Sequence, residues 1–231
     1  MPDHMTPLLF AASPAPLKDA QLYASAYAQA SPERRQRVDR LTRMEDKIPV
    51  LASEMLLFYA LRAAGLREFP PQLTHTGKRK PCLVQGRLHF NLSRSGGVEG
   101  WVVCAVADTE VGCDVEQVGD WDKAVARHYF KNYEYVDTVA QFTHEARRER
   151  FFRYWTLKES FMKATGLGLS LPLRSFRITL GDTVGVEQSV DPRLFHFQEF
   201  ADLEGYKCAL CTAGEERPLA RLCVVDLRDV R

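Results

Sequence analysis

Hydrophobic residues follow two patterns along this chain, one with helical spacing and one with the short runs and alternation of strands. The helical pattern predicts helices over 17–30, 50–64, 122–129 and 146–165, and Ser31-Pro32-Glu33 has the composition of a further helix start. The strand pattern predicts strands over 88–92, 101–107, 111–115, 176–180, 184–190, 195–200, 206–211 and 221–226. Because helices precede strands in both halves, we expect an α+β protein of two lobes, residues 1–110 and 111–231.

One predicted strand, at 111–116, carries two acidic residues on one face. Its odd-numbered positions are apolar, whereas Gly112, Asp114 and Glu116 point to the opposite side. Neighbouring carboxylates repel each other unless a positive charge neutralises them, and Mg²⁺ commonly binds one or two carboxylates together with substrate phosphates. Gly112 would leave room on that face for a ligand to approach. The alternative is a solvated strand end with two surface acids.

The predicted helix 146–165 carries charge on both its polar and its apolar face. Glu159 and Lys163 lie four residues apart on the polar side, where an ordinary surface ion pair is the alternative to a functional role. Lys158 falls within the apolar face, where an unpaired charge is costly. It therefore either extends outward to water or meets a buried anionic partner.

Three further segments contain candidate ligands for a phosphate or a proton. Residues 91–95 offer hydroxyls, backbone amides and a guanidinium in a predicted turn, which is either a phosphate cradle or a serine-capped turn. The arginines of 34–40 either hold an anion or form a solvated helix face. Glu134 is a candidate general base, although its spacing alone says little.

Composition limits the class of protein. With 45% hydrophobic and 26% charged residues and a net charge of +1, the 231 residues resemble a soluble globular protein without a global field for nucleic acid or a membrane. No apolar run reaches bilayer length, and no basic residue precedes the apolar stretch 8–12, so we expect a cytoplasmic protein without a secretory signal. Six scattered cysteines fit free thiols in a reducing compartment. Cys208 and Cys211 would point to opposite faces of a strand rather than share a metal.

Together these segments resemble the Sfp-type (surfactin-type) 4′-phosphopantetheinyl transferases. The most specific features are the acidic strand Gly-Cys-Asp-Val-Glu and the helix motif Trp-x-x-Lys-Glu-x-x-x-Lys, taken as a pair. The resemblance is carried in order by residues 31–35, 80–81, 90–95, 112–116, 130–135, 155–163, 168–173 and 205–207. It implies a monomer of two similar α/β lobes related by a pseudo-twofold, with coenzyme A between them. It also implies the reaction, in which a serine of an apo acyl or peptidyl carrier protein takes the phosphopantetheine arm of coenzyme A and 3′,5′-ADP leaves.

The resemblance also implies roles for the acidic residues and the lysines. Three carboxylates would bind Mg²⁺, with Mn²⁺ as a candidate substitute: Asp114, Glu116 and Glu159. Lys163, together with Lys158, would bind the coenzyme and neutralise charge on the phosphoryl and leaving oxygens. Glu134 or Glu159, directly or through water, would accept the proton of the attacking serine.

The first lobe would supply most of the residues that bind the coenzyme. Arg34 and Arg37 match family positions that hold its 3′-phosphate. Lys80 and Pro81 match the loop beside adenine, and Ser93 lies in the predicted phosphate cradle.

The sequence departs from the family at two positions near that phosphate. Arg94 stands where the family usually has histidine, and Pro49-Val50 stands where many members have an arginine. Arginine keeps its charge near neutral pH, so Arg94, or else Lys47, would compensate. We therefore expect a rearranged 3′-phosphate pocket beside an unchanged metal centre.

Two alternatives and the identity of the partner stay open at this point. One alternative is a non-catalytic binder of coenzyme A or carrier protein, and the other is a different magnesium-dependent nucleotide enzyme. The chain contains no Gly-x-x-x-x-Gly-Lys-Ser/Thr loop, which argues against a P-loop enzyme. Fatty-acid, polyketide and nonribosomal-peptide carriers all fit. The carrier is expected to contact the region 117–150, whose aromatic residues include Trp121, Tyr129, Phe130 and Phe142.

Overall fold

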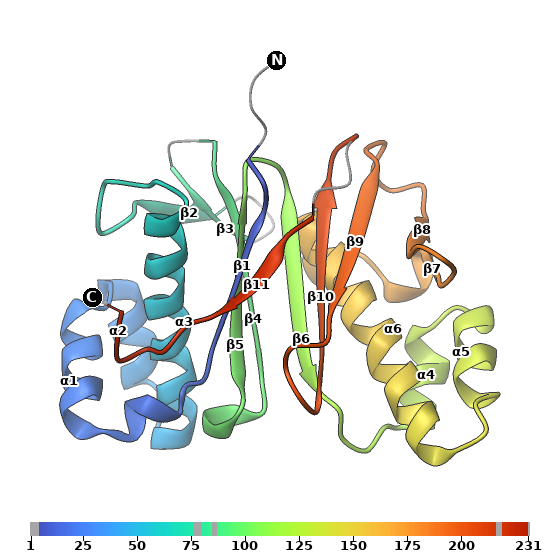
Figure 1. Cartoon of the computed structure of the whole chain (residues 1–231), viewed down its shortest axis with the longest axis horizontal. Coiled ribbons are helices and arrows are strands. Elements are labelled where there is room, and N and C mark those ends of the chain that lie inside the picture. The colour runs from blue at the N-terminus through green and yellow to red at the C-terminus, as the bar shows by residue number, and fades with distance from the viewer. Residues whose placement is uncertain (1–4, 76–79, 85–86, 216–218, 231) are drawn as a thin grey trace.

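Two lobes, each a β-sheet covered by a long helix, stand side by side in the computed structural model (Figure 1). The structure describes residues 5–75, 80–84, 87–215 and 219–230. Within these residues no helix is long and apolar enough to cross a membrane. The six cysteines are free thiols.

The first lobe is built on a four-stranded sheet in the order β11-β1-β5-β4. Its strands are β1 (Leu8–Ala12), β4 (His89–Ser95), β5 (Trp101–Ala107) and β11 (Arg221–Val224). Three helices pack beside it: α1 (Ala20–Gln29), α2 (Pro32–Asp39) and the long α3 (Met44–Ala63). A small hairpin pairs β2 (Leu73–His75) with β3 (Pro81–Leu83). The predicted apolar strand at 101–107 is confirmed, and its residues after Trp101 are fully buried because α3 and the second lobe cover its two faces.

The second lobe is built on a three-stranded antiparallel sheet in the order β6-β10-β9. Its strands are β6 (Val111–Gln117), β9 (Phe195–Phe200) and β10 (Tyr206–Ala213), with a separate pair β7 (Arg177–Thr179) and β8 (Gly185–Glu187). Its helices are α4 (Lys123–Tyr129), α5 (Asn132–Val139) and α6 (His144–Ala164). As predicted, the two cysteines of β10 face opposite ways, since Cys208 packs between the lobes and Cys211 packs under α6.

An apolar layer joins the two lobes. The odd-numbered residues of β6 pack against inward-facing residues of β1, β5 and β10, and the main members of this cluster are Leu9, Val103, Ala105, Val111, Cys113, Val115 and Leu210. Burying an aliphatic side chain of this size stabilises a fold by about 1.5–3 kcal/mol. The contact between the lobes is therefore a hydrophobic core, which leaves the opposite face of β6 for α6.

The predicted α+β class is confirmed, and several boundaries differ from the prediction. The helix expected at 50–64 begins at Met44, with Pro49 inside it, and the helix 132–139 was not predicted. The segment 93–95, expected in a turn, belongs to strand β4, and the turn begins at Gly96 with a φ of 81°. Serines and glycines are typical of turns, but here the polar side chains of β4 find partners on β6, as described below.

One strand crosses between the halves of the chain. β11 comes after the second sheet in sequence, yet it pairs in parallel with β1 of the first sheet, from Leu8 opposite Arg221 to Ala11 opposite Val224. The division of the chain at residue 110 and the pseudo-twofold relation stay predictions. The crossing ties the last strand of the second half to the first lobe.

Candidate active site

Strand β6 presents its acidic face to helix α6, as the alternation predicted. Gly112 lies so close to the helix that a Cβ there would sit 2.1 Å from the Ser160 carbonyl oxygen and 2.4 Å from the Ala164 nitrogen. The expected space for a ligand at Gly112 is therefore occupied by the helix backbone. The consequence is that α6 lies directly on β6 and brings its own charged side chains to Asp114.

Lys163 of α6 pairs with Asp114 of β6 rather than with Glu159. Its Nζ lies 2.6 Å from Asp114 Oδ1, 3.0 Å from Ser93 Oγ and 3.2 Å from the Cys113 carbonyl oxygen. Burial, the largest single influence, opposes the charge of Lys163, but Asp114, Cys113 and Glu159 together outweigh it, and the pKa of the lysine is raised. Asp114 Oδ2 is buried without a hydrogen-bond partner among the described residues.

The other two acidic residues gather around this pair. Burial, then the charges of Asp114 and Glu116, raises the pKa of Glu159 to about 7, although Lys163 acts in the opposite direction. Burial and the charge of Asp114 also raise the pKa of Glu116, and hydrogen bonds from Ser95 and Trp155 counteract this. Three carboxylates thus crowd one place, and the charge of Asp114 makes both glutamates harder to ionise. We call Asp114, Glu116 and Glu159 the carboxylate cluster.

This donor set fits a divalent cation. Carboxylate oxygens are the ligands that Mg²⁺ prefers, and an unpartnered buried oxygen on Asp114 together with the repulsion among Asp114, Glu116 and Glu159 is relieved by a cation. In the conformation of the described residues, no three acidic, histidine or cysteine side chains are already grouped around a single metal position. Binding would therefore require rotation of side chains, without a change of fold.

A row of side chains on β4 fastens the first lobe to β6. Asn91 Oδ1 accepts from the Cys113 backbone N–H at 2.9 Å, Ser93 Oγ donates to Asp114 Oδ1 at 2.7 Å, and Ser95 Oγ donates to Glu116 Oε2 at 2.8 Å. Because these residues alternate along one strand, all three point across the junction between the sheets. We call Asn91, Ser93 and Ser95 the β4 side-chain row.

A pocket of about 400 Å³ opens beside this row, between α2, α3 and the turn after β4. It is lined by Arg37, Leu41, Glu45, Asp46, Pro49, Val50, Arg94, Ser95, Gly96 and Gly97. Partial desolvation, followed by the charges of Arg37 and Arg34, lowers the pKa of Arg94. Arg37 and Arg94 give this pocket two guanidinium groups that can bind an anion, and of the two acidic residues in its lining Glu45 is paired with Arg43. We call it the arginine pocket.

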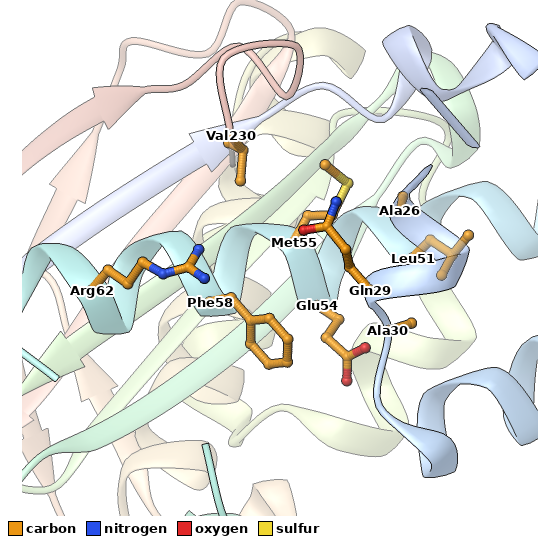
Figure 2. A pocket seen from close by; sticks show the side chains of 9 residues that line it. All are labelled: Ala26, Gln29, Ala30, Leu51, Glu54, Met55, Phe58, Arg62 and Val230. Atoms are coloured by element: carbon orange, nitrogen blue, oxygen red, sulfur yellow. The ribbon is translucent and has the colours of Figure 1, made fainter. Parts of the chain in front are cut away.

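The remaining predicted coenzyme ligands are placed differently. Arg34 is largely turned toward Glu54, whose Oε1 lies 3.4 Å from the arginine Nε and which also accepts from the Ser31 backbone and hydroxyl. Glu54 reaches from α3 into a small hollow beside α1 (Figure 2). Lys80 immediately precedes β3, and its Nζ reaches the beginning of β6, where it contacts Glu110 Oε2 and the Val111 carbonyl oxygen at 3.0 Å each. Lys80, Pro81 and Lys47 are not among the described residues that line the arginine pocket.

Lys158 and Glu134 meet each other, away from the carboxylate cluster. The Lys158 Nζ lies 2.7 and 2.8 Å from the two Glu134 oxygens and 3.0 Å from the Phe176 carbonyl oxygen, and both side chains are completely buried. Burial lowers the pKa of Lys158, and Glu134 opposes that shift. Of the two expectations for Lys158, the buried anionic partner is therefore confirmed. The roles of this pair on substrate stay predictions, and the geometry favours a structural role.

Comparisons with known proteins agree on one family. The model of the 4′-phosphopantetheinyl transferase superfamily matches residues 110–211, which include β6, α6 and most of β10. The transferase Sfp of Bacillus subtilis is 31% identical over 81% of this chain and 84% of its own length. The chain belongs to the Sfp-type 4′-phosphopantetheinyl transferases. A second Bacillus subtilis 4′-phosphopantetheinyl transferase is 33% identical over 80% of this chain and 83% of its own, and gsp of Aneurinibacillus migulanus is 29% identical over 84% and 81%.

Among solved structures, the holo-[acyl-carrier-protein] synthase of Thermotoga maritima aligns with 47% of this transferase and 64% of its own chain. The sequence identity is 21% and the TM-score is 0.40.

The sequence placed Ser95 in the candidate phosphate cradle 91–95 but did not predict its contact with an acidic residue. Ser95 contacts Glu116 and also lines the arginine pocket, so it belongs to both halves of the site. The signal was the repeat of polar residues two apart, at 91, 93 and 95, which is the period of a strand. Interpreting the segment as a turn concealed that period.

Proposed function

We propose that this protein transfers the 4′-phosphopantetheine arm of coenzyme A to a serine hydroxyl of an apo acyl or peptidyl carrier protein, in a Mg²⁺-dependent reaction. Family membership supports the enzyme class and the use of coenzyme A. The single observation that carries the rest is that a carboxylate cluster and an arginine pocket adjoin at Ser95. A pyrophosphate needs a cation and a terminal phosphate needs fixed positive charge, and coenzyme A carries both groups.

In this proposal the arginine pocket holds the 3′-phosphate of the coenzyme through Arg37 and Arg94. Asp114, Glu116 and Glu159 would hold Mg²⁺, which when bound supplies charge neutralisation at the pyrophosphate. Lys163 lies within hydrogen-bond distance of Asp114, which supports a role for its ammonium in neutralising charge on the pyrophosphate oxygens.

The chemical step is a displacement at phosphorus. The serine oxygen of the carrier forms a new bond to the phosphorus that bears pantetheine, the bond from that phosphorus to 3′,5′-ADP breaks, and the serine proton goes to a base. Glu159 is the better candidate base, since it lies beside Asp114 and Glu116 in the carboxylate cluster, where the reaction is proposed to occur. Glu134 is fully buried and accepts from Lys158, the Lys131 N–H and the Ile178 N–H.

The carrier protein would dock on the exposed apolar side chains of α4 and α5 and the loop that follows. Tyr129, Tyr133 and Val136 are 41%, 52% and 50% exposed, and Phe142 is 100% exposed. Of the aromatic residues expected here, Phe130 is buried and belongs to the core. Fatty-acid, polyketide and nonribosomal-peptide carriers remain the candidate partners.

We also infer that the enzyme acts as a cytoplasmic monomer, without a nucleic acid or membrane partner. All proposed ligands come from a single chain, and its free cysteines fit a reducing compartment. Light scattering at working concentration tests the monomer, and a dimer mass would contradict it.

The decisive experiment incubates the protein with coenzyme A, Mg²⁺ and apo carriers of the three classes, and weighs the carriers by mass spectrometry. A mass gain of one phosphopantetheine is expected with at least one carrier. Asp114→Ala should abolish transfer while thermal unfolding shows a folded protein. No gain with any carrier, together with retained binding of coenzyme A, would favour a non-catalytic binder.

A further inference from the structure

Ser95 lies between the arginine pocket and the carboxylate cluster. It belongs to the first lobe, whereas Glu116, which it contacts, belongs to the second. Its Oγ is 2.8 Å from Glu116 Oε2 and 3.0 Å from the Gln117 backbone nitrogen. Strand β4 is part of the first sheet, whereas Glu116 and Gln117 end strand β6 of the second sheet. A contact between lobes is thus made on a proposed metal ligand.

The direction of these hydrogen bonds follows from the donors available. A serine hydroxyl has a single proton and two lone pairs, and a carboxylate only accepts. The Gln117 N–H donates to Ser95 Oγ, so the hydroxyl proton is directed to Glu116 Oε2. The bond orients the carboxylate and occupies only one of its two oxygens.

Ser93 repeats the same arrangement two residues earlier. The Lys163 ammonium donates to Ser93 Oγ at 3.0 Å, and that hydroxyl donates to Asp114 Oδ1 at 2.7 Å. Each acidic residue of β6 therefore has its own serine on β4. A repeat of this kind is more than is needed to join two strands, because Asn91 joins them through the N–H and thiol of Cys113, without contacting a carboxylate.

We propose that Ser95 is a positioning residue, through which the first lobe orients Glu116 for the metal ion. The proposal rests on the metal centre of the proposed function. Residues that hydrogen-bond to a metal ligand fix its orientation, and their loss typically weakens metal binding by about 10- to 100-fold. Because Ser95 also lines the arginine pocket, the proposal links the binding site of the 3′-phosphate to the metal centre.

The competing explanation is that Ser95 only fastens the strands together, and Asn91 provides the matched control. Asn91 belongs to the same side-chain row and contacts the Cys113 N–H, but neither Asp114 nor Glu116 accepts a bond from it. Asn91→Ala therefore weakens the junction between β4 and β6 and leaves the hydrogen bonds from Ser93 and Ser95 to the two carboxylates in place. If Ser95 acts through Glu116, the two substitutions must differ in metal affinity.

The test measures Mn²⁺ binding by the electron paramagnetic resonance of free Mn²⁺, with coenzyme A present and without a carrier. We expect Ser95→Ala to weaken binding by about 10- to 100-fold, Ser95→Thr to restore it to within severalfold because its hydroxyl is kept, and Asn91→Ala to leave it unchanged. The Mg²⁺ concentration for half-maximal transfer should rise in parallel in Ser95→Ala, while excess Mg²⁺ recovers most of kcat. Binding of coenzyme A without metal should match the wild type in Asn91→Ala and should change by less than the Mn²⁺ affinity in the two Ser95 variants.

Two results would overturn the proposal while leaving the metal centre intact. One is wild-type Mn²⁺ affinity in Ser95→Ala, and the other is an equal loss of affinity in Asn91→Ala, which would assign the effect to the strand junction. If the wild type itself bound no Mn²⁺ in the presence of coenzyme A, the metal centre of the proposed function would fail, and the role of Ser95 with it. Should Ser95→Ala not fold, Ser95→Cys takes its place, since a thiol of similar size is a weak donor and must shift the affinity in the same direction.

Discussion

The ammonium of Lys158 lies between the two carboxylate oxygens of Glu134, at 2.7 and 2.8 Å, with both side chains fully buried. The pair links three elements, since Glu134 is on α5, Lys158 on α6, and Glu134 also accepts from the Ile178 N–H of β7. The family resemblance assigned both residues to the chemistry. Their enclosure favours a structural role within the second lobe, and their roles on substrate stay predictions.

Breaking this pair should destabilise the protein strongly. Lys158→Met leaves a buried carboxylate without its partner, which typically costs about 3–5 kcal/mol in the free energy of unfolding. The double variant Lys158→Met/Glu134→Leu removes both charges and should recover a large part of that loss. Urea unfolding at neutral pH measures both effects. A stable Lys158→Met protein that no longer transfers phosphopantetheine would show instead that Lys158 acts on substrate.

Gly112 should not tolerate even one methyl group. In Gly112→Ala the Cβ would lie 2.1 Å from the Ser160 carbonyl oxygen, so α6 must move off β6 and Lys163 away from Asp114. Overpacking of this kind typically costs about 1–3 kcal/mol. We expect a lower midpoint of thermal unfolding and a higher Mg²⁺ requirement for transfer. Gly119→Ala is the control, because a Cβ at Gly119 meets no atom within 4 Å; equal behaviour of the two variants would contradict the prediction.

The arginine pocket should determine whether the 3′-phosphate is recognised. A hydrogen bond to a charged group contributes about 1.5–3 kcal/mol, so Arg37→Ala or Arg94→Ala should raise KM for coenzyme A by about tenfold or more. KM for dephospho-coenzyme A, which lacks that phosphate, should not change. Arg40→Ala on the same helix is the control, since Arg40 is exposed and is not among the described lining residues. A wild-type enzyme that used both substrates equally well would exclude this role of the pocket.

Glu110 should make part of the stability depend on pH. A hydrogen bond from His89, together with Lys80, lowers the pKa of Glu110 from 4.5 to about 2, against an opposing effect of burial. The folded protein then binds fewer protons than the unfolded chain, so the contribution is present above pH 4.5 and is lost as the pH falls toward 2. Glu110→Gln should therefore be less stable than the wild type at neutral pH, and the difference should shrink by about pH 3 in urea unfolding. Glu204→Gln, at an exposed carboxylate, serves as the control, and a difference that stayed constant with pH would count against the ion pair.

The sequence was most informative about features that depend on a single helix or strand, such as the direction in which a side chain points. The alternation of β6 predicted the faces of Asp114 and Glu116, because a strand places alternate side chains on opposite sides whatever surrounds it. It did not predict that the α6 backbone would occupy the space over Gly112, since that depends on where a distant helix packs.

Other features depended on tertiary contacts that no local pattern contains. Ser93 and Ser95 have the composition of a turn, but hydrogen bonds to Asp114 and Glu116 hold them in a strand. The apolar face of α6 predicted that Lys158 would need a buried acid, yet nothing in the spacing identified Glu134, which lies 24 residues away. The arginines at 37 and 94 were expected near a phosphate because of the family resemblance, and the pocket that brings them together appeared only in the fold.

The return of β11 to the first sheet has a consequence for any attempt to divide the protein. A fragment that ended before β11 would leave β1 paired only with β5, with an unprotected row of backbone donors and acceptors on its other edge. Such an open edge invites pairing with a second molecule, so we expect the isolated first half to self-associate. In the full chain β11 covers that edge of β1. Expression of single lobes should therefore give aggregates rather than soluble halves.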